Sequence, residues 1–176
     1  GPDVNTEGDG LGMDLDDNAD AQQMIQKLRD QGHTIGNHGG WIHNYFGANA
    51  NDDNGDDFMQ YLDLNNEAVT KANGGQVPKE YSAPTGNQPL WVYDWMKQQG
   101  VQAYYTSASV GMQPTRLWLG FQQIDSAWAF PVLTYGQVAS AEEASFMKMP
   151  VDEFGQWLQQ LALFIEKTRS IRLSYF

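Results

Sequence analysis

The sequence contains no cysteine, only three histidines, and fewer than half as many basic as acidic residues. Without cysteine, the chain cannot use a thiol nucleophile, form a disulfide bond or bind zinc through sulfur. Its 10 Lys and Arg against 22 Asp and Glu give a formal net charge of −12, which phosphate backbones and anionic lipid surfaces repel. No apolar run approaches the ~20 residues needed to cross a bilayer. We therefore expect neither a nucleic-acid partner nor insertion into a membrane.

The length and the supply of apolar residues fit one globular domain that spans residues 1–176. The chain is 41% hydrophobic and 12% aromatic, which is enough to form a core at this length. Large flat side chains fill cores, but they also stack on the apolar faces of sugar rings. Composition alone favours the core, and it does not indicate an oligomeric state.

Segments with helical periodicity alternate along the chain with short apolar segments. We expect helices near residues 19–31, 57–72, 88–99 and 151–168, and strands at 33–36, 80–83, 101–106, 128–133 and 171–176. Strands that alternate with helices of 10 to 17 residues indicate a parallel α/β sheet or barrel. Only about five strands can be recognised, so the sheet is either open or part of a barrel.

The three histidines lie within eleven residues, directly after a predicted strand. Loops at the carboxyl ends of parallel strands are where α/β folds build their sites, and imidazole is a common metal ligand. His38 and His43 are five positions apart, which on a regular helix would turn them about 140° from each other. Because Gly39 and Gly40 loosen the backbone, we predict a loop or bulged turn that lets both rings converge. Unrelated surface or core histidines are the alternative.

The segment from Gly32 to His43 resembles the second motif of the polysaccharide deacetylases, carbohydrate esterase family four, whose domain is also called the NodB homology domain. The family pattern is glycine-histidine-glutamate-isoleucine-glycine-asparagine-histidine, with a further histidine four residues later. Here that last spacing is one residue longer. The resemblance implies that His38 and His43 bind a divalent metal, expected to be zinc, with cobalt, nickel or manganese as alternatives. It assigns His33 a structural role.

A second match lies between Tyr81 and Gly86. It resembles the family's third motif, arginine-x-proline-x-glycine at the end of a strand, with Ser82 where the family has arginine. The resemblance implies that the backbone N–H of Thr85 is the catalytic oxyanion donor and that Pro84 contributes to substrate binding.

Two tryptophans are expected near the substrate. Trp128, followed by Pro131, weakly resembles the part of the family motif that walls the acetyl pocket. Trp41, between the two histidines, is expected at the rim of the site. A core role for Trp128 and an anchoring role for Trp41 remain the alternatives.

Two family motifs have no counterpart in the chain. The aspartate pair that supplies a metal ligand and the general base is expected before Gly1, and the final leucine-histidine motif after Phe176. We therefore expect an incomplete, distorted (β/α) barrel that shows little turnover by itself. The resemblance also implies a secreted, periplasmic or cell-surface location.

The expected function is metal-dependent removal of acetyl groups from a polysaccharide or oligosaccharide, so an acetylated glycan is the expected partner. A non-catalytic glycan-binding module on the same fold is one alternative, which the replacement of arginine by Ser82 favours. A different metal hydrolase on an α/β scaffold is the other.

Overall fold

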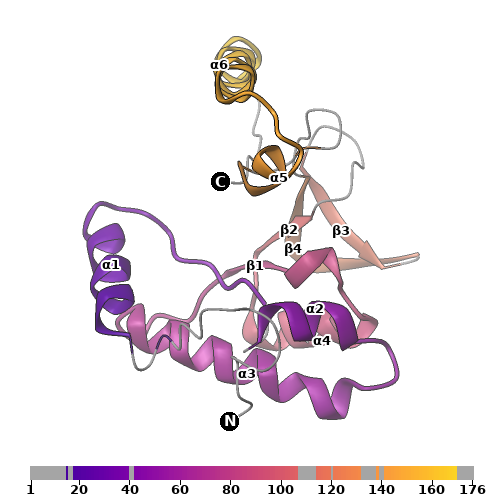
Figure 1. Ribbon diagram of the computed structural model, residues 1–176. Coiled ribbons are helices and arrows are strands. Elements are labelled where there is room, and N and C mark those ends of the chain that lie inside the picture. The colour runs from indigo at the N-terminus through magenta and orange to yellow at the C-terminus, as the bar shows by residue number, and fades with distance from the viewer. Residues whose placement is uncertain are drawn as a thin grey trace.

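The computed structural model describes residues 15, 18–39, 42–106, 114–119, 121–131, 138 and 141–169. The predicted strand at 171–176 and the side chain of Trp41 lie outside these ranges. Within them the chain forms a mixed α/β structure of helices and one four-stranded sheet (Figure 1).

The four longer α-helices of the described residues follow the hydrophobic periodicity of the sequence, and two shorter ones were not predicted. The described α-helices are α1 (Ala19–Asp30), α2 (His43–Asn49), α3 (Gly55–Ala72), α4 (Leu90–Gln99), α5 (Ala141–Phe146) and α6 (Val151–Thr168). The four predicted helices correspond to α1, α3, α4 and α6. The other two have only six or seven residues, too few for a clear 3.6-residue pattern. None of the described helices is long and apolar enough to span a membrane.

The sheet consists of β1 (Glu80–Ser82), β2 (Ala103–Thr106), β3 (Thr115–Leu119) and β4 (Gln122–Pro131), in the order β1-β2-β4-β3. Strands β1, β2 and β4 are parallel, whereas β3 is antiparallel to β4. The expected parallel sheet is therefore found in β1, β2 and β4, whereas β3, which was not predicted as a strand, makes the sheet mixed. A connection as short as the one around Phe121 can join only antiparallel neighbours. The described strands form an open sheet, so closure into a barrel stays a prediction.

The strand predicted at 33–36 is not formed: the segment pairs with the sheet only at the next residue, through a single parallel bridge between Asn37 and Tyr81. The N–H of Asn37 donates to the Glu80 carbonyl at 2.8 Å, and the N–H of Ser82 donates to the Asn37 carbonyl at 3.0 Å. This bridge fixes the segment that ends in His38 beside the carboxyl end of β1.

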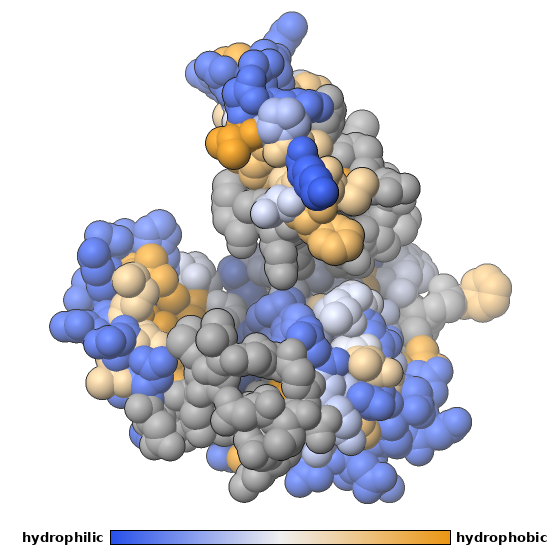
Figure 2. Space-filling model, viewed as in Figure 1, coloured by the Kyte–Doolittle hydropathy of each residue, from blue (hydrophilic) through white to orange (hydrophobic). Residues whose placement is uncertain are grey.

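The hydrophobic core lies where α2, α3 and α4 cover one side of the sheet (Figure 1). Phe46, Leu62, Tyr81, Val92 and Trp95 are all buried there. In Figure 1, α5 and α6 lie well away from these three helices. Figure 2 shows exposed hydrophobic side chains on that separate part of the molecule, whereas the surface over the core helices is mostly hydrophilic.

Candidate active site

The imidazole rings of His38 and His43 converge at the carboxyl end of β1. Their Nε2 atoms are 2.9 Å apart, and their ring centroids are separated by 4.7 Å with the planes tilted by 46°. His43 is the first residue of α2, and His38 precedes the loop that leads to it. The expected convergence is present in the structure, while metal binding by the pair stays a prediction.

Each ring is also held through its other nitrogen. Nδ1 of His38 lies 2.5 Å from Oγ of Ser82, and Nδ1 of His43 lies 2.9 Å from Oδ1 of Asn44. A second hydrogen bond of this kind sets the orientation of an imidazole ring. Both Nε2 atoms are therefore turned toward the same point.

The spacing of the two Nε2 atoms suits a divalent metal. Two nitrogens at Zn–N distances of ~2.0–2.1 Å are about 2.9 Å apart at a right angle and about 3.3 Å apart at the tetrahedral angle. The observed 2.9 Å thus needs a change of less than about half an ångström for either geometry. Within the described ranges, no group of three His, Cys, Asp or Glu side chains is placed to bind a metal. The pair therefore offers two ligands.

The surroundings favour the uncharged form of His38. Burial of the ring and, next, the coulombic effect of His43 lower the pKa of His38 from its ordinary value, and a hydrogen bond with Ser82 opposes that shift. A lowered pKa keeps the ring neutral near pH 7, and neutral imidazole is the form that binds metals.

The turn after His38 depends on the contact between Gly39 and Pro84. Gly39 has φ +94°, and a Cβ at this position would lie 1.9 Å from Cγ of Pro84. Only glycine allows this backbone to approach the proline ring so closely. Pro84 is fully buried. Its ring supports residues 37–39, called the histidine loop below, and presents little surface for the substrate contact expected from the sequence.

A network of buried amides lies beneath the histidine loop. Nδ2 of Asn65 donates to Oδ1 of Asn37 at 2.7 Å and to the Gly39 carbonyl at 2.9 Å. Nδ2 of Asn37 donates to Oδ1 of Asn66 at 3.2 Å, and Asn66 donates to Oε1 of Gln99 at 3.3 Å. These bonds connect the backbone on both sides of His38 to α3 and α4.

Thr85 lies in the turn that follows β1, next to α2. Its φ of 53° and ψ of 15° are in the left-handed region, which is unusual for a β-branched residue. The N–H groups of Gly86 and Asn87 donate to Ala83 and Pro84, whereas in the described part of the chain the N–H of Thr85 makes no hydrogen bond. That leaves it able to donate to a ligand. Its role as oxyanion donor stays a prediction.

The same turn is tied directly to the helix that begins with His43. Nδ2 of Asn87 donates to the carbonyls of Gly47 and Ala50, at 3.0 and 2.7 Å. Gly47 also packs so closely that a Cβ there would lie 2.5 Å from Oγ1 of Thr85. The candidate metal ligand His43 and the candidate oxyanion donor Thr85 thus lie on two segments that pack directly against each other.

Trp128 lies farther from the histidine pair than the sequence suggested. On β2, Trp128 pairs with Ala103, whereas Ser82, the residue that contacts His38, pairs with Tyr105. Trp128 therefore lies two residues farther from the carboxyl end of the sheet than Ser82 does. It is also two strands away from β1, about 10 Å across the sheet. Its ring lies 4.3 Å from the guanidinium carbon of Arg116. The structure does not bring it to His38, and the substrate roles proposed for Trp128 and Trp41 stay predictions.

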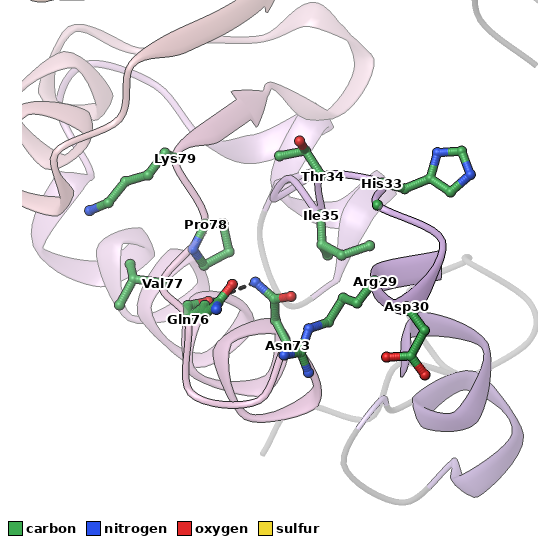
Figure 3. Close-up of a pocket in the computed structure, with 11 residues that line it drawn as sticks. Arg29, Asp30, His33, Thr34, Ile35, Asn73, Gln76, Val77, Pro78 and Lys79 are labelled. Atoms are coloured by element: carbon green, nitrogen blue, oxygen red, sulfur yellow. Dashed lines mark hydrogen bonds between the residues drawn. The ribbon is translucent and has the colours of Figure 1, made fainter. Parts of the chain in front are cut away.

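His33 lies five residues before His38, at the amino end of the segment that pairs with β1, and away from the histidine pair. It lines an open groove of about 390 Å³ whose wall includes Arg29, Asn73 and Lys79. Lys79 directly precedes β1, so this groove is at the amino end of the strand, while His38 is at the carboxyl end. Figure 3 shows Arg29 extended toward Asn73 and the His33 ring turned away from the other side chains. His33 is exposed.

Sequence reasoning did not identify the supporting residues Asn65, Asn66 and Asn87. One signal was available for Asn66, because it takes a buried place in the helical stripe that includes Phe58 and Leu62. A polar residue at an apolar position of an amphipathic helix usually has a buried hydrogen-bond partner. The partner itself could not be named from the sequence.

Comparison with known proteins gives a structural likeness. No protein-family model matches the sequence, and no curated protein matches it significantly. A crystal structure of a "putative polysaccharide deacetylase" from Mycobacterium smegmatis matches with a TM-score of 0.50 and 20% sequence identity. The match covers 64% of this chain and 36% of that one. At this identity the likeness shows the fold alone: this chain has an α/β fold similar to part of that protein.

Proposed function

We propose that this protein is a divalent-metal-dependent hydrolase that removes acetyl groups from a polysaccharide or oligosaccharide. The observation that carries the proposal is the pair of facing Nε2 atoms of His38 and His43. The fold likeness to a protein described as a polysaccharide deacetylase supports the same class of reaction. An exported or cell-surface location would suit such a substrate.

The residues at the carboxyl end of β1 have complementary tasks in this reaction. A divalent metal bound there would supply a Lewis acid and a water molecule of lowered pKa. His38 and His43 would hold the ion through Nε2, because Nδ1 of each ring is already engaged. The N–H of Thr85 donates to the acetyl carbonyl oxygen as that oxygen gains negative charge. The products are acetate and a free amine or hydroxyl group on the sugar.

The first prediction tests the histidine pair with a matched control. In the 176-residue chain, His38→Ala should abolish zinc binding by the pair and any zinc-dependent acetate release from an acetylated chito-oligosaccharide. His33→Ala should change neither, because His33 lies near Lys79 at the amino end of β1, away from the pair. Zinc binding is measured by calorimetry and by the imidazole NMR signals, and acetate release by an enzymatic assay.

Two results would contradict this proposal. One is zinc binding by the His38→Ala chain with the affinity of the unaltered protein. The other is acetate release that survives a chelator unchanged. Because zinc binding is measured separately from turnover, a chain that binds zinc without releasing acetate indicates that the site lacks part of its catalytic machinery.

A non-catalytic glycan-binding module is the second candidate. It is favoured by Ser82 at the position of the family's arginine and by the described residues, which contain no third His, Cys, Asp or Glu at the pair. Binding of the same oligosaccharide that persists in chelator, with no acetate release at any zinc concentration, would support this candidate over the hydrolase.

A further inference from the structure

The hydrogen bond between Ser82 and His38 is built into the sheet. Ser82 is the last residue of β1 and only 8% exposed, and its Oγ lies 2.5 Å from Nδ1 of His38. The backbone N–H of Ser82 donates to the carbonyl of Asn37, the residue directly before His38. The parallel bridge therefore fixes the backbones of both partners, so the hydroxyl is a rigid neighbour of the ring.

The partners of His43 determine which nitrogen of that ring carries hydrogen. Its Nδ1 faces Oδ1 of Asn44 at 2.9 Å. An amide oxygen only accepts, so Nδ1 of His43 carries the hydrogen and Nε2 presents a lone pair. For His38 also to present a lone pair at Nε2, its own hydrogen must be on Nδ1. That tautomer needs an acceptor at the position of Ser82.

A serine hydroxyl can satisfy both tautomers of His38 because it donates and accepts. In the metal-free protein, Nε2–H of His38 can donate to the lone pair of His43, and the Ser82 hydroxyl then donates to Nδ1. When Nε2 is needed as a ligand, the hydrogen moves to Nδ1 and Oγ of Ser82 accepts it. The charge of the ring does not change. An arginine, which the family resemblance leads one to expect here, could only donate.

We propose that Ser82 is a positioning residue of the histidine site: its hydroxyl stabilises the His38 tautomer whose Nε2 lone pair binds the metal. This rests on the proposed metal-dependent function and gives Ser82 a task different from that of the family's arginine. A residue that hydrogen-bonds the second nitrogen of a metal-bound histidine raises metal affinity by fixing the ring.

The second prediction compares Ser82→Ala with Ser82→Thr in the full 176-residue chain. Ser82→Ala should weaken zinc binding by about 10- to 100-fold, whereas Ser82→Thr, which retains the hydroxyl, should keep most of the affinity. Nitrogen-15 NMR of the imidazoles should show the His38 hydrogen on Nδ1 in the zinc-bound unaltered protein. In the zinc-free state the hydrogen should be on Nε2 in both the unaltered protein and Ser82→Ala, because the bond to His43 remains; the variant lacks only the acceptor for Nδ1–H that the zinc-binding tautomer needs. Backbone amide spectra check that each variant is folded.

The outcomes separate this inference from the proposed function. If the unaltered chain binds no divalent metal, both fail. If it binds zinc and the folded Ser82→Ala variant binds equally well, only the role of Ser82 is overturned. The same holds if Ser82→Thr loses as much affinity as Ser82→Ala, because the hydroxyl is then not the group that matters.

Discussion

At the scale of single residues, the contact between Gly39 and Pro84 determines whether the histidine loop can form. Gly39 combines a positive φ with a backbone that touches Pro84. Gly75, which lies outside the site, has a similar φ of +82° but nothing within 4 Å of a Cβ. A comparison of the two glycines therefore separates the strain of a positive φ from a steric clash. Pro84 is fully buried and cannot move away without opening the loop.

The third prediction compares alanine substitutions at Gly39 and Gly75. Gly39→Ala should lower the free energy of unfolding by more than about 2 kcal/mol, because it adds a clash with Pro84 to the strain of a positive φ. Gly75→Ala should cost only about 1 kcal/mol, since it adds strain alone. Chemical denaturation measures both. Equal losses in the two variants would mean that the contact with Pro84 is unimportant.

At the scale of secondary-structure elements, the loop is positioned by helix α3 as well as by β1. Asn65 donates to groups on both sides of His38, so the helix acts as a support beneath the candidate ligand. Gln60 lies on the same helix but is exposed, and its side chain bonds only the nearby Asp57 carbonyl. This gives a control on the same element.

The fourth prediction concerns Asn65. Asn65→Ala should lower the free energy of unfolding by about 1–3 kcal/mol, because it leaves partly buried acceptors without a donor. It should also weaken zinc binding, since the backbone around His38 loses its support. Gln60→Ala should stay within about 0.5 kcal/mol of the unaltered protein. Unchanged zinc affinity in a folded Asn65→Ala chain would limit the role of Asn65 to stability.

At the scale of the whole molecule, the apolar residues are divided between a packed side and an exposed side. Phe46 on α2 is completely buried, whereas Phe146 at the end of α5 is 86% exposed. Val151, which begins α6, is 88% exposed. The core that stabilises the candidate site is therefore the one between the sheet and helices α2, α3 and α4.

The fifth prediction compares the two phenylalanines. Phe46→Ala should cost about 3–5 kcal/mol of unfolding free energy, because it removes a buried ring and leaves a cavity. Phe146→Ala should change stability by no more than about 0.5 kcal/mol and should reduce the binding of a hydrophobic dye. Thermal unfolding and dye fluorescence measure the two effects. A large loss of stability in Phe146→Ala would show that this side chain is packed in solution.

The sequence by itself determined the features that depend on local patterns. Helical periodicity located α3, α4 and α6 within a few residues, since contacts along a helix involve neighbours three and four apart. The clustering of His38 and His43 and the Pro84–Gly86 turn also stand out in the sequence, and both lie at the candidate site. Whether the pair binds metal stays a prediction.

Only the tertiary structure decided how these residues meet. Ser82 contacts His38 across 44 positions, and Asn65 reaches Asn37 across 28; both contacts follow from the parallel bridge and the packing of α3. The antiparallel β3 was missed for a related reason. A strand is defined by its neighbours in the sheet, and five residues of sequence do not reveal which strand pairs with them or in which direction.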